Sequence, residues 1–184
     1  RIRDDVDSVI AELTTSITSY GLHAIKFNPN AYLVSSDPWD DGLFRPFWEA
    51  ATSLNVPIFF SLGPGPGNHK GESSSENLGG YLDEMRILMR WMDRYPDAVC
   101  SITHGFPYRS FLEGGKIRLP DSIWEPFDNP NLSIELCFPV RIGDIFDFPY
   151  DEARPTLEEM VSWIGADRLM WGTDMPFQSR HCTY

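Results

Sequence analysis

"YPDAVCSITHG", Tyr95–Gly105, holds the pattern that decides the fold of this 184-residue chain. It follows a stretch in which apolar residues recur at helical spacing. It then turns into the apolar run Val99–Ile102 and ends in a histidine, His104. A helix that leads into an apolar strand is the repeating unit of α/β proteins, so the question is how often the chain repeats it.

Helical and strand-like segments alternate about five times along the chain. The helical spacing covers residues 2–20, 44–54, 81–92 and 157–164, and the strand-like runs cover residues 22–27, 58–60, 99–102, 132–138 and 168–176. Several of these runs are almost continuously apolar, which is typical of strands buried on both faces. The alternation therefore predicts an α/β fold with a parallel sheet covered by helices.

Two architectures fit this alternation: an open doubly wound sheet and a (β/α)8 TIM barrel. "GPGPG", Gly63–Gly67, is a poor match to a dinucleotide-binding loop, because its prolines lack amide donors and no helix follows directly. We favour the barrel because polar residues recur where strands end, as in barrel active sites. These residues are Lys26, Ser61, His104, Glu135 and Asp174. A full barrel needs about 250 residues, so residues 1–184 are expected to form one partial domain that holds the later five strands.

The composition limits the partners of this domain. The formal net charge is −12 and the pI is about 4.6, so neither nucleic acid nor an anionic membrane surface is an expected partner. No apolar run approaches the roughly 20 residues that span a bilayer. The three cysteines form no C-x-x-C pair, which favours a reducing, cytoplasmic location without disulfides.

His104 and Asp174 are the main candidates for chemistry. By strand alternation His104 shares a face with Cys100 and Ile102 and points inward at the barrel rim. It is either a core histidine bonded to a carbonyl or a group that transfers protons. Asp174 closes "MWGTDMP" and is costly to bury without a compensating metal, arginine or amide. It is either a turn cap or a functional carboxylate, and Gly172 would let another group approach it closely.

Other candidates each have two interpretations. Lys26 either binds an anionic substrate or extends into solvent. Arg109 either binds a carboxylate in bidentate fashion or is solvated. Glu135 is either paired within the barrel or close to the site. His69 lies in the glycine-rich segment Gly63–Gly80, which follows a strand and is either a lid over the same rim or a surface insertion.

Five segments together resemble the amidohydrolase-related family, the aminocarboxymuconate semialdehyde decarboxylase-like branch of metal-dependent TIM-barrel enzymes. They are "GLHAIKF", "VPIFFSLG", "YPDAVCSITHG", "NPNLSIEL" and "IGADRLMWGTDMPF". The resemblance runs from about Gly21 to the end of the chain, and the last segment is its most specific part. It implies a barrel enzyme, and homodimer formation is expected from the resemblance alone.

The family's usual residue roles can be carried onto this chain in part. By the resemblance, Asp174 matches the strand-eight metal ligand and His104 the strand-six histidine that transfers protons or holds substrate. Lys26, Ser61 and Arg109 are then substrate contacts. The implied cofactor is a divalent metal, with zinc as the expected ion. The family's strand-one ligand pair has no counterpart in this chain, and Ser61 stands where the strand-five histidine is expected.

Ser61 leaves three explanations open, because a serine hydroxyl is a poor zinc ligand. A smaller ligand set could include Asp174 and residues upstream of Arg1, His69 could supply a ligand, or the protein could work without metal. The favoured function is a metal-dependent hydrolase acting on a small carboxylated cyclic or aromatic compound. The alternatives are a non-oxidative decarboxylase of an aromatic or muconate-type acid, and an inactive barrel that serves as a binding subunit.

Overall fold

A parallel five-stranded sheet organises the chain, in the order β1-β2-β3-β6-β7. The computed structural model describes residue 2 and residues 5–29, 38–63, 74–137, 141–143 and 145–180. The strands are β1 (Ile25–Phe27), β2 (Ile58–Phe60), β3 (Cys100–Ile102), β6 (Leu132–Leu136) and β7 (Leu169–Trp171). Each neighbouring pair is parallel. The five predicted strands and the parallel sheet are confirmed.

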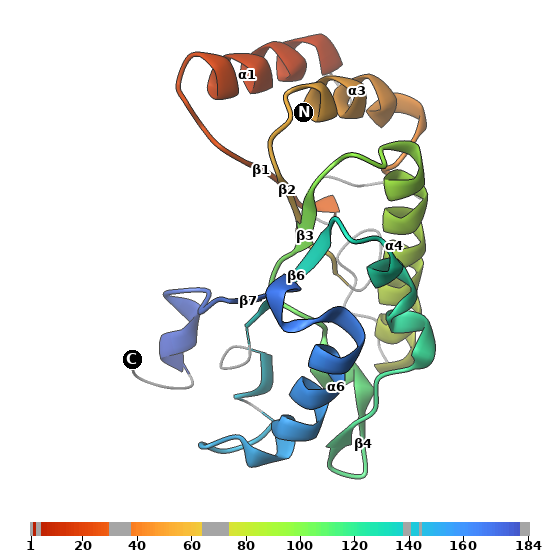
Figure 1. Cartoon of the computed structure of the whole chain (residues 1–184), viewed down its shortest axis with the longest axis vertical. Helices are drawn as coiled ribbons and strands as arrows, with labels where there is room; N and C mark the ends of the chain where they lie inside the picture. Colours follow the sequence, from red (N-terminus) through yellow and green to blue (C-terminus); the bar gives the residue numbers. More distant parts are fainter. Residues whose placement is uncertain are drawn as a thin grey trace.

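Four helices accompany the sheet within the described part of the chain. They are α1 (Val6–Thr18), α3 (Arg45–Ser53), α4 (Ser74–Arg94) and α6 (Arg154–Ile164). Figure 1 shows α4 alongside the strands, α1 and α3 together at one end of the molecule, and α6 toward the other. This is the helix-covered parallel sheet of a partial TIM barrel. None of the described helices is long and apolar enough to cross a bilayer.

Short elements connect these parts. The small hairpin of β4 (Leu112–Glu113) and β5 (Lys116–Ile117) was not predicted, and it turns through two glycines with positive φ, Gly114 and Gly115. Single turns of 3₁₀ helix complete the connections: η1 (Gly42–Phe44), η2 (Tyr108–Phe111), η3 (Asp121–Ile123), η4 (Glu125–Asp128), η5 (Asp151–Ala153), η6 (Ala166–Arg168) and η7 (Phe177–Arg180).

The last part of the glycine-rich segment after β2 is helical. Helix α4 begins at Ser74, so Ser74 and Ser75 lie in a helix, and the interpretation of this part of the segment as a surface insertion is wrong. The low helix propensity of serine and glycine is a weak guide here. Helix formation is cooperative, so a helix that the amphipathic pattern stabilises from Tyr81 onward can extend toward its N-terminus through these residues. Residues 64–73, including His69, lie outside the described residues.

The sheet has one face for packing and one for the interior of the barrel. Phe27, Phe60, Ile102 and Ile134 are in register across four strands and are buried. The Phe60 ring lies 5.7 Å from Trp48 of α3 and 5.0 Å from the ring of Trp91 on α4. These register positions therefore face the helices.

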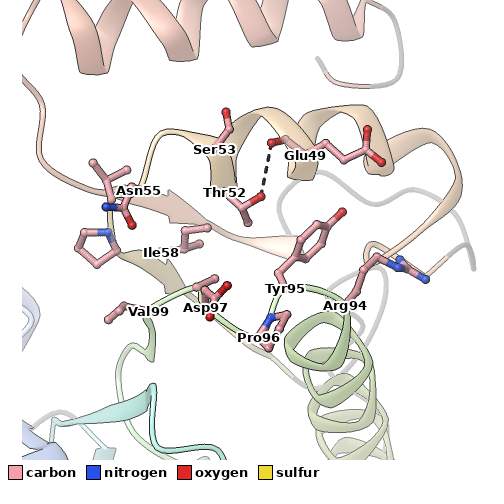
Figure 2. Close-up of a pocket in the computed structure, with 13 residues that line it drawn as sticks. Glu49, Thr52, Ser53, Asn55, Ile58, Arg94, Tyr95, Pro96, Asp97 and Val99 are labelled. Carbon is pink, nitrogen blue, oxygen red and sulfur yellow. Dashed lines mark hydrogen bonds between the residues drawn. The ribbon is translucent and has the colours of Figure 1, made fainter.

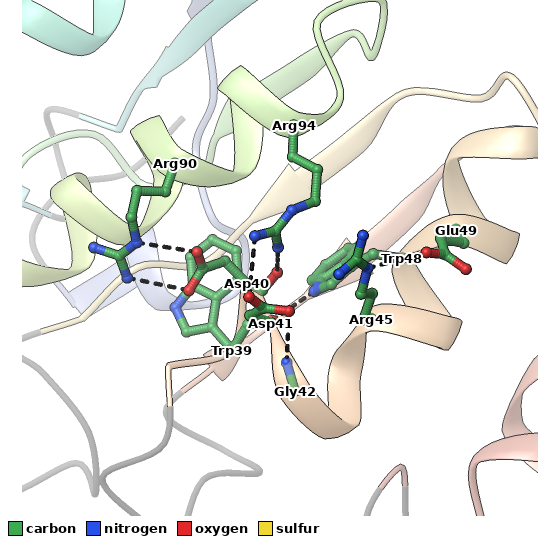
Figure 3. Close-up of polar contacts among 9 residues, drawn as sticks. All are labelled: Trp39, Asp40, Asp41, Gly42, Arg45, Trp48, Glu49, Arg90 and Arg94. Atoms are coloured by element: carbon green, nitrogen blue, oxygen red, sulfur yellow. Dashed lines mark hydrogen bonds and ion pairs between the residues drawn. The ribbon is translucent and has the colours of Figure 1, made fainter.

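A polar clamp holds the segment before η1 against α4 (Figure 3). Arg90 binds Asp40 through two hydrogen bonds of 3.1 Å, and Arg94 binds the Asp41 carboxylate at 3.0 Å. Beneath them the Trp39 indole donates to the buried Glu84 carboxylate at 2.6 Å. The clamp fixes the aromatic layer beneath β1 and β2, because Trp39 packs on both Phe27 and Phe60.

Candidate active site

A cavity of about 460 Å³ opens on the interior face and carboxyl ends of the strands. We call it the carboxyl-end cavity. Lys26, His104, Glu135 and Asp174 line it, together with apolar residues such as Met170. Parallel strands bring their carboxyl ends to one edge, so four polar residues from four different strands or the turns after them meet there. One cation, two carboxylates and an imidazole thus share one space.

His104 and Asp174 both have left-handed backbones. Their φ angles are +68° and +51°, in a region that costs a residue with a side chain about 1–2 kcal/mol. Such conformations persist only where the surroundings enforce them, and they gather at functional sites. Asn55 also has a positive φ, but it follows the end of α3, where a left-handed residue is common. His104 and Asp174 follow strands, where helix termination gives no such reason.

Two charged side chains hold the backbone of His104 in this conformation. Its N–H donates to Glu135 Oε2 at 2.8 Å, and its carbonyl accepts from Arg141 Nε at 2.7 Å. The prediction that His104 shares a face of the strand with Cys100 and Ile102 is wrong. Cys100 and Ile102 lie on the helix-facing side of β3, and His104 reaches the cavity because regular strand geometry ends at Ile102.

Gly172 makes room for the Glu135 carboxylate. A Cβ atom at position 172 would lie 1.6 Å from Glu135 Oε1 and 2.4 Å from its carboxyl carbon. The expectation that Gly172 permits a close approach is confirmed, and the group that approaches is Glu135. Its carboxylate can therefore sit under His104 only because residue 172 has no side chain.

The imidazole of His104 lies between Ser61 and Asp174. Ser61 Oγ is 3.1 Å from Nδ1, whereas Asp174 Oδ1 is 3.8 Å from Nε2. The Asp174 side chain is 30% exposed and that of His104 22%, so both remain accessible from the cavity. Burial, and then the nearby charges of Arg141 and Lys26, lower the pKa of His104, and Asp174 and Glu135 oppose this. The lowered pKa of His104 favours its neutral form.

Most of the residues predicted from the sequence come together here. Lys26, His104 and Asp174 line the cavity, and Ser61 reaches it through its contact with His104. Glu135, whose place was left open, also belongs to the site. Arg109 does not line the cavity, since it is exposed on η2.

Arg141 is the residue that sequence reasoning missed. It follows β6 by five positions, and an arginine shortly after a strand end was the same signal that drew attention to Arg109. Position alone could have found it. The hydrogen bond from the Arg141 guanidinium to the His104 carbonyl, however, depends on a backbone conformation that the sequence pattern does not reveal.

The described residues supply only part of a metal site. Asp174 and His104 turn a carboxylate oxygen and a ring nitrogen toward one point, a donor pair that suits a divalent transition metal. Glu135 is engaged by the His104 amide. Within the ranges described above, no group of three histidine, cysteine or acidic side chains could hold a metal ion. A metal at this site would need ligands from elsewhere in the protein.

This sheet and site define the chain as the partial barrel of an amidohydrolase-type protein. The profile of the Amidohydrolase family matches residues 2–184, so the chain belongs to that family. A search of curated proteins gives no match.

Solved structures of the same fold extend this result. A 2,6-dihydroxybenzoate decarboxylase from Rhizobium is 20% identical with a TM-score of 0.64, covering 95% of this chain and 58% of that one. A dihydroxybenzoic acid decarboxylase from a Polaromonas species, with bound manganese and the inhibitor 2-nitroresorcinol, is 20% identical with a TM-score of 0.58, covering 95% and 57%. A probable 2-pyrone-4,6-dicarboxylic acid hydrolase from Acinetobacter baumannii is 15% identical with a TM-score of 0.61, covering 94% and 55%.

These likenesses fix the fold. The chain spans little more than half the length of each of these solved relatives. The metal named for the Polaromonas enzyme is manganese. A divalent metal thus accords with a solved relative, but the zinc expected from the sequence has no support there.

Proposed function

We propose that the protein containing this chain is a non-oxidative decarboxylase of a small aromatic acid. The observation that carries the proposal is the convergence of Lys26, His104 and Asp174 on one cavity. The sequence favoured hydrolysis first. The likeness to dihydroxybenzoate decarboxylases supports the decarboxylating alternative more strongly.

The cavity can orient such an acid. The Lys26 ammonium provides positive charge for a carboxylate or phenolate, and Phe59 and Met170 provide apolar surface for a ring. A volume of about 460 Å³ lies within the usual range for small-molecule sites, about 300–1,000 Å³. Lys26 is exposed on β1, so it can reach the substrate without leaving a buried partner.

The reaction needs a proton delivered to one ring carbon. A C–H bond forms at the carbon that carries the carboxylate, the C–C bond to the carboxylate breaks, and its electron pair returns to the ring as CO₂ leaves. Neither an oxidant nor a reductant is consumed. His104 Nε2 can take up and deliver that proton, and the Asp174 carboxylate, with Oδ1 at 3.8 Å from Nε2, places negative charge beside the protonated ring.

Asp174 is also the proposed carboxylate ligand for a divalent metal, with manganese in place of the zinc first expected. When bound, such an ion would supply positive charge beside the substrate's carboxylate. The remaining ligands would come from outside the described residues. Elemental analysis of the full-length protein should show stoichiometric metal, reduced in Asp174→Asn but not in Asp97→Asn.

Hydrolysis is the second candidate, because the fold also matches the probable pyrone-dicarboxylic acid hydrolase. In that reaction Asp174 or His104 would take a proton from the water that attacks a lactone carbonyl. A cyclic dicarboxylate would use Lys26 in the same way as an aromatic acid does. The two functions therefore share the site and differ in their products.

One product assay separates these functions. The full-length protein is incubated with 2,6-dihydroxybenzoate, 5-carboxyvanillate and 2-pyrone-4,6-dicarboxylate, and CO₂ and organic products are measured. We expect CO₂ and the decarboxylated phenol, both lost in Asp174→Asn and His104→Ala. A ring-opened acid without CO₂ would replace the proposal with hydrolysis. Binding of these acids without turnover would support the inactive barrel.

Three further proposals follow from the sequence: a homodimer, expected from the family resemblance; a cytoplasmic location, expected from the cysteine pattern; and residues 1–184 as part of a single barrel domain, expected from the chain length and the alternation of its segments. Size-exclusion chromatography with light scattering of the full-length protein tests the first. We expect twice the mass of one chain, and a monomer at micromolar concentration would contradict it.

A further inference from the structure

A chain of hydroxyl groups runs from the His104 ring into the sheet. Ser61 Oγ lies 3.1 Å from His104 Nδ1 and 3.1 Å from Thr103 Oγ1. Thr103 Oγ1 in turn lies 3.2 Å from the Phe60 carbonyl oxygen. Ser61 is only 6% exposed and Thr103 only 7%, so water does not readily substitute for these contacts.

The number of protons on these groups determines which atom donates in each hydrogen bond. This chain of hydroxyl groups has three contacts between successive groups: carbonyl to Thr103, Thr103 to Ser61, and Ser61 to His104. Thr103 Oγ1 also lies 3.4 Å from His104 Nδ1, and this longer contact is left out of the count. The two hydroxyls supply one proton each, and the carbonyl can only accept. All three contacts are hydrogen bonds only if the third proton comes from His104 Nδ1–H. Nδ1 then donates to Ser61, Ser61 to Thr103, and Thr103 to Phe60.

The opposite tautomer leaves one contact without a proton. If Nδ1 accepted from Ser61, Thr103 could donate either to Ser61 or to the Phe60 carbonyl, and the other of these two oxygen pairs, at 3.1 or 3.2 Å, would have no hydrogen between them. The Phe60 carbonyl keeps its bond from the Thr103 N–H at 2.9 Å in either case, so the opposite tautomer has one hydrogen bond fewer along this path, and the Nδ1–H tautomer is favoured by that one bond. Asp174 does not outweigh this, because 3.8 Å from Nε2 is too long for a hydrogen bond.

We propose that Ser61 and Thr103 are positioning residues that hold His104 as its Nδ1–H tautomer, so that the Nε2 electron pair points into the carboxyl-end cavity beside Asp174. This gives Ser61 a role at the position where the family resemblance leads one to expect a histidine. The catalytic consequence rests on the proposed function, because Nε2 is the atom that would take up and deliver the proton. The tautomer itself does not depend on which reaction occurs.

The test reads the tautomer directly. Full-length protein labelled with ¹⁵N-histidine and stripped of metal by a chelator is studied by long-range ¹H–¹⁵N correlation spectroscopy at pH 7.5. We expect the His104 signals to show a protonated Nδ1 and an unprotonated Nε2. Ser61→Ala should shift the population toward Nε2–H, and Thr103→Val should do so more weakly. Thr103→Ser keeps the hydroxyl and should restore the wild-type pattern.

Ser101→Ala is the matched control. Ser101 is also a buried serine, on β3, and its hydroxyl has no hydrogen-bond partner among the described residues. Its removal should leave the His104 signals unchanged. Nε2–H in the wild type, or an unchanged tautomer in Ser61→Ala, would overturn the proposal.

The kinetic test is kept separate. With 2,6-dihydroxybenzoate as substrate, Ser61→Ala should lower kcat about tenfold with little change in KM, since proton transfer by a positioned group contributes about 10²–10⁴-fold and a mixed tautomer loses part of this. If the tautomer result holds but no acid on the panel is turned over, the proposed function fails and the positioning role stands.

Discussion

Two cavities of nearly equal size lie at opposite ends of the strands, and they differ in what their charged residues face. The carboxyl-end cavity has about 460 Å³ and the amino-end cavity, between α3 and the starts of β2 and β3, about 450 Å³. In the amino-end cavity Glu49 pairs with Arg45, and Arg94 pairs with Asp41. Neither of those partners lines the cavity, and Figure 2 shows the Glu49 and Asp97 carboxylates pointing in different directions.

In the carboxyl-end cavity, by contrast, the charged and titratable side chains lie close to one another. His104 and Asp174 face each other. Glu135 accepts a hydrogen bond from the His104 N–H, and Arg141 donates one to the His104 carbonyl.

Left-handed backbones occur elsewhere among the described residues other than glycine, at Asn55 after α3 and at Tyr150 before η5. Only His104 and Asp174 have them after strands, and both line the carboxyl-end cavity. Cavity size therefore does not identify the site. The site is identified by charged side chains that meet in one cavity and by backbone conformations that their surroundings enforce.

Removal of the facing pair should have the largest effect. Asp174→Asn and His104→Ala should each lower kcat/KM for the aromatic acid by about 10²–10⁴-fold, the usual contribution of positioned proton transfer. Asp97→Asn, in the amino-end cavity, changes an exposed carboxylate of the same type and should leave kcat/KM within twofold. Steady-state kinetics of the three variants tests this, and equal losses in all three would erase the distinction between the cavities.

Gly172→Ala should damage the site through Glu135. The new methyl group needs the space of the Glu135 carboxylate, so the hydrogen bond to His104 N–H is lost. We expect kcat/KM to fall at least tenfold and the free energy of unfolding by about 1–3 kcal/mol, as for other losses of a buried hydrogen-bond partner. Urea titration and kinetics measure the two effects.

Gly21→Ala is the control for that substitution. Gly21 has a φ of +71° and open space around it, so alanine should cost about 1 kcal/mol of stability through its backbone alone and leave kcat/KM unchanged. Full activity in Gly172→Ala would show that the Glu135 contact does not support the site.

Glu84 should give the protein a pH-dependent stability that belongs to neither cavity. Burial raises its pKa to about 7 from the ordinary 4.5. The stability it allows is fully present below pH 4.5 and is lost as the pH rises through about 7, because the folded state must then ionise a buried group. Glu84→Gln should remove this slope, with a gain at pH 8 on the order of 3 kcal/mol at most.

Thermal unfolding between pH 4.5 and 8 measures the Glu84 effect, with Glu158→Gln on α6 as an exposed control. A wild-type slope that survives Glu84→Gln would assign the titration to another group. Activity at fixed pH should be the same in both variants, since Glu84 contacts Trp39 rather than the cavity.

The smallest effect is expected at the rim of the amino-end cavity. Glu49 and Arg45 pair at 3.2 Å, but their side chains are 60% and 56% exposed. Such a helical pair contributes about 0.3–0.5 kcal/mol. Glu49→Gln should lower the free energy of unfolding by no more than that and leave kcat/KM unchanged. A loss of activity would indicate that this cavity takes part in function.

The alternation of helical segments with apolar runs was enough to predict the parallel sheet and its five strands. Strands that are buried on both faces consist almost entirely of apolar residues, so they can be recognised from the sequence. The site was predictable in part. Lys26 lies on a strand, and Ser61, His104 and Asp174 lie shortly after strands. Neighbouring parallel strands bring their carboxyl ends to one edge of the sheet. This much follows from position in the sequence.

The remaining geometry depends on backbone turns that no periodicity encodes. His104 enters the cavity through a positive φ, not through strand alternation. Arg141 follows β6 and reaches the His104 carbonyl, whereas Arg109, which also follows a strand, lies exposed on η2. The hydrogen bonds from His104 through Ser61 to Thr103 depend on the register that places β2 beside β3. The direction in which each bond donates therefore could not be predicted from the sequence.

A crystal structure of the full-length protein soaked with 2,6-dihydroxybenzoate tests the central claim most directly. We predict the aromatic ring in the carboxyl-end cavity, with its carboxylate within reach of Lys26 and its ring carbon facing the His104–Asp174 pair. Electron density for the acid in the amino-end cavity, between Asn55 and Asp97, with the carboxyl-end cavity free of it, would contradict the account.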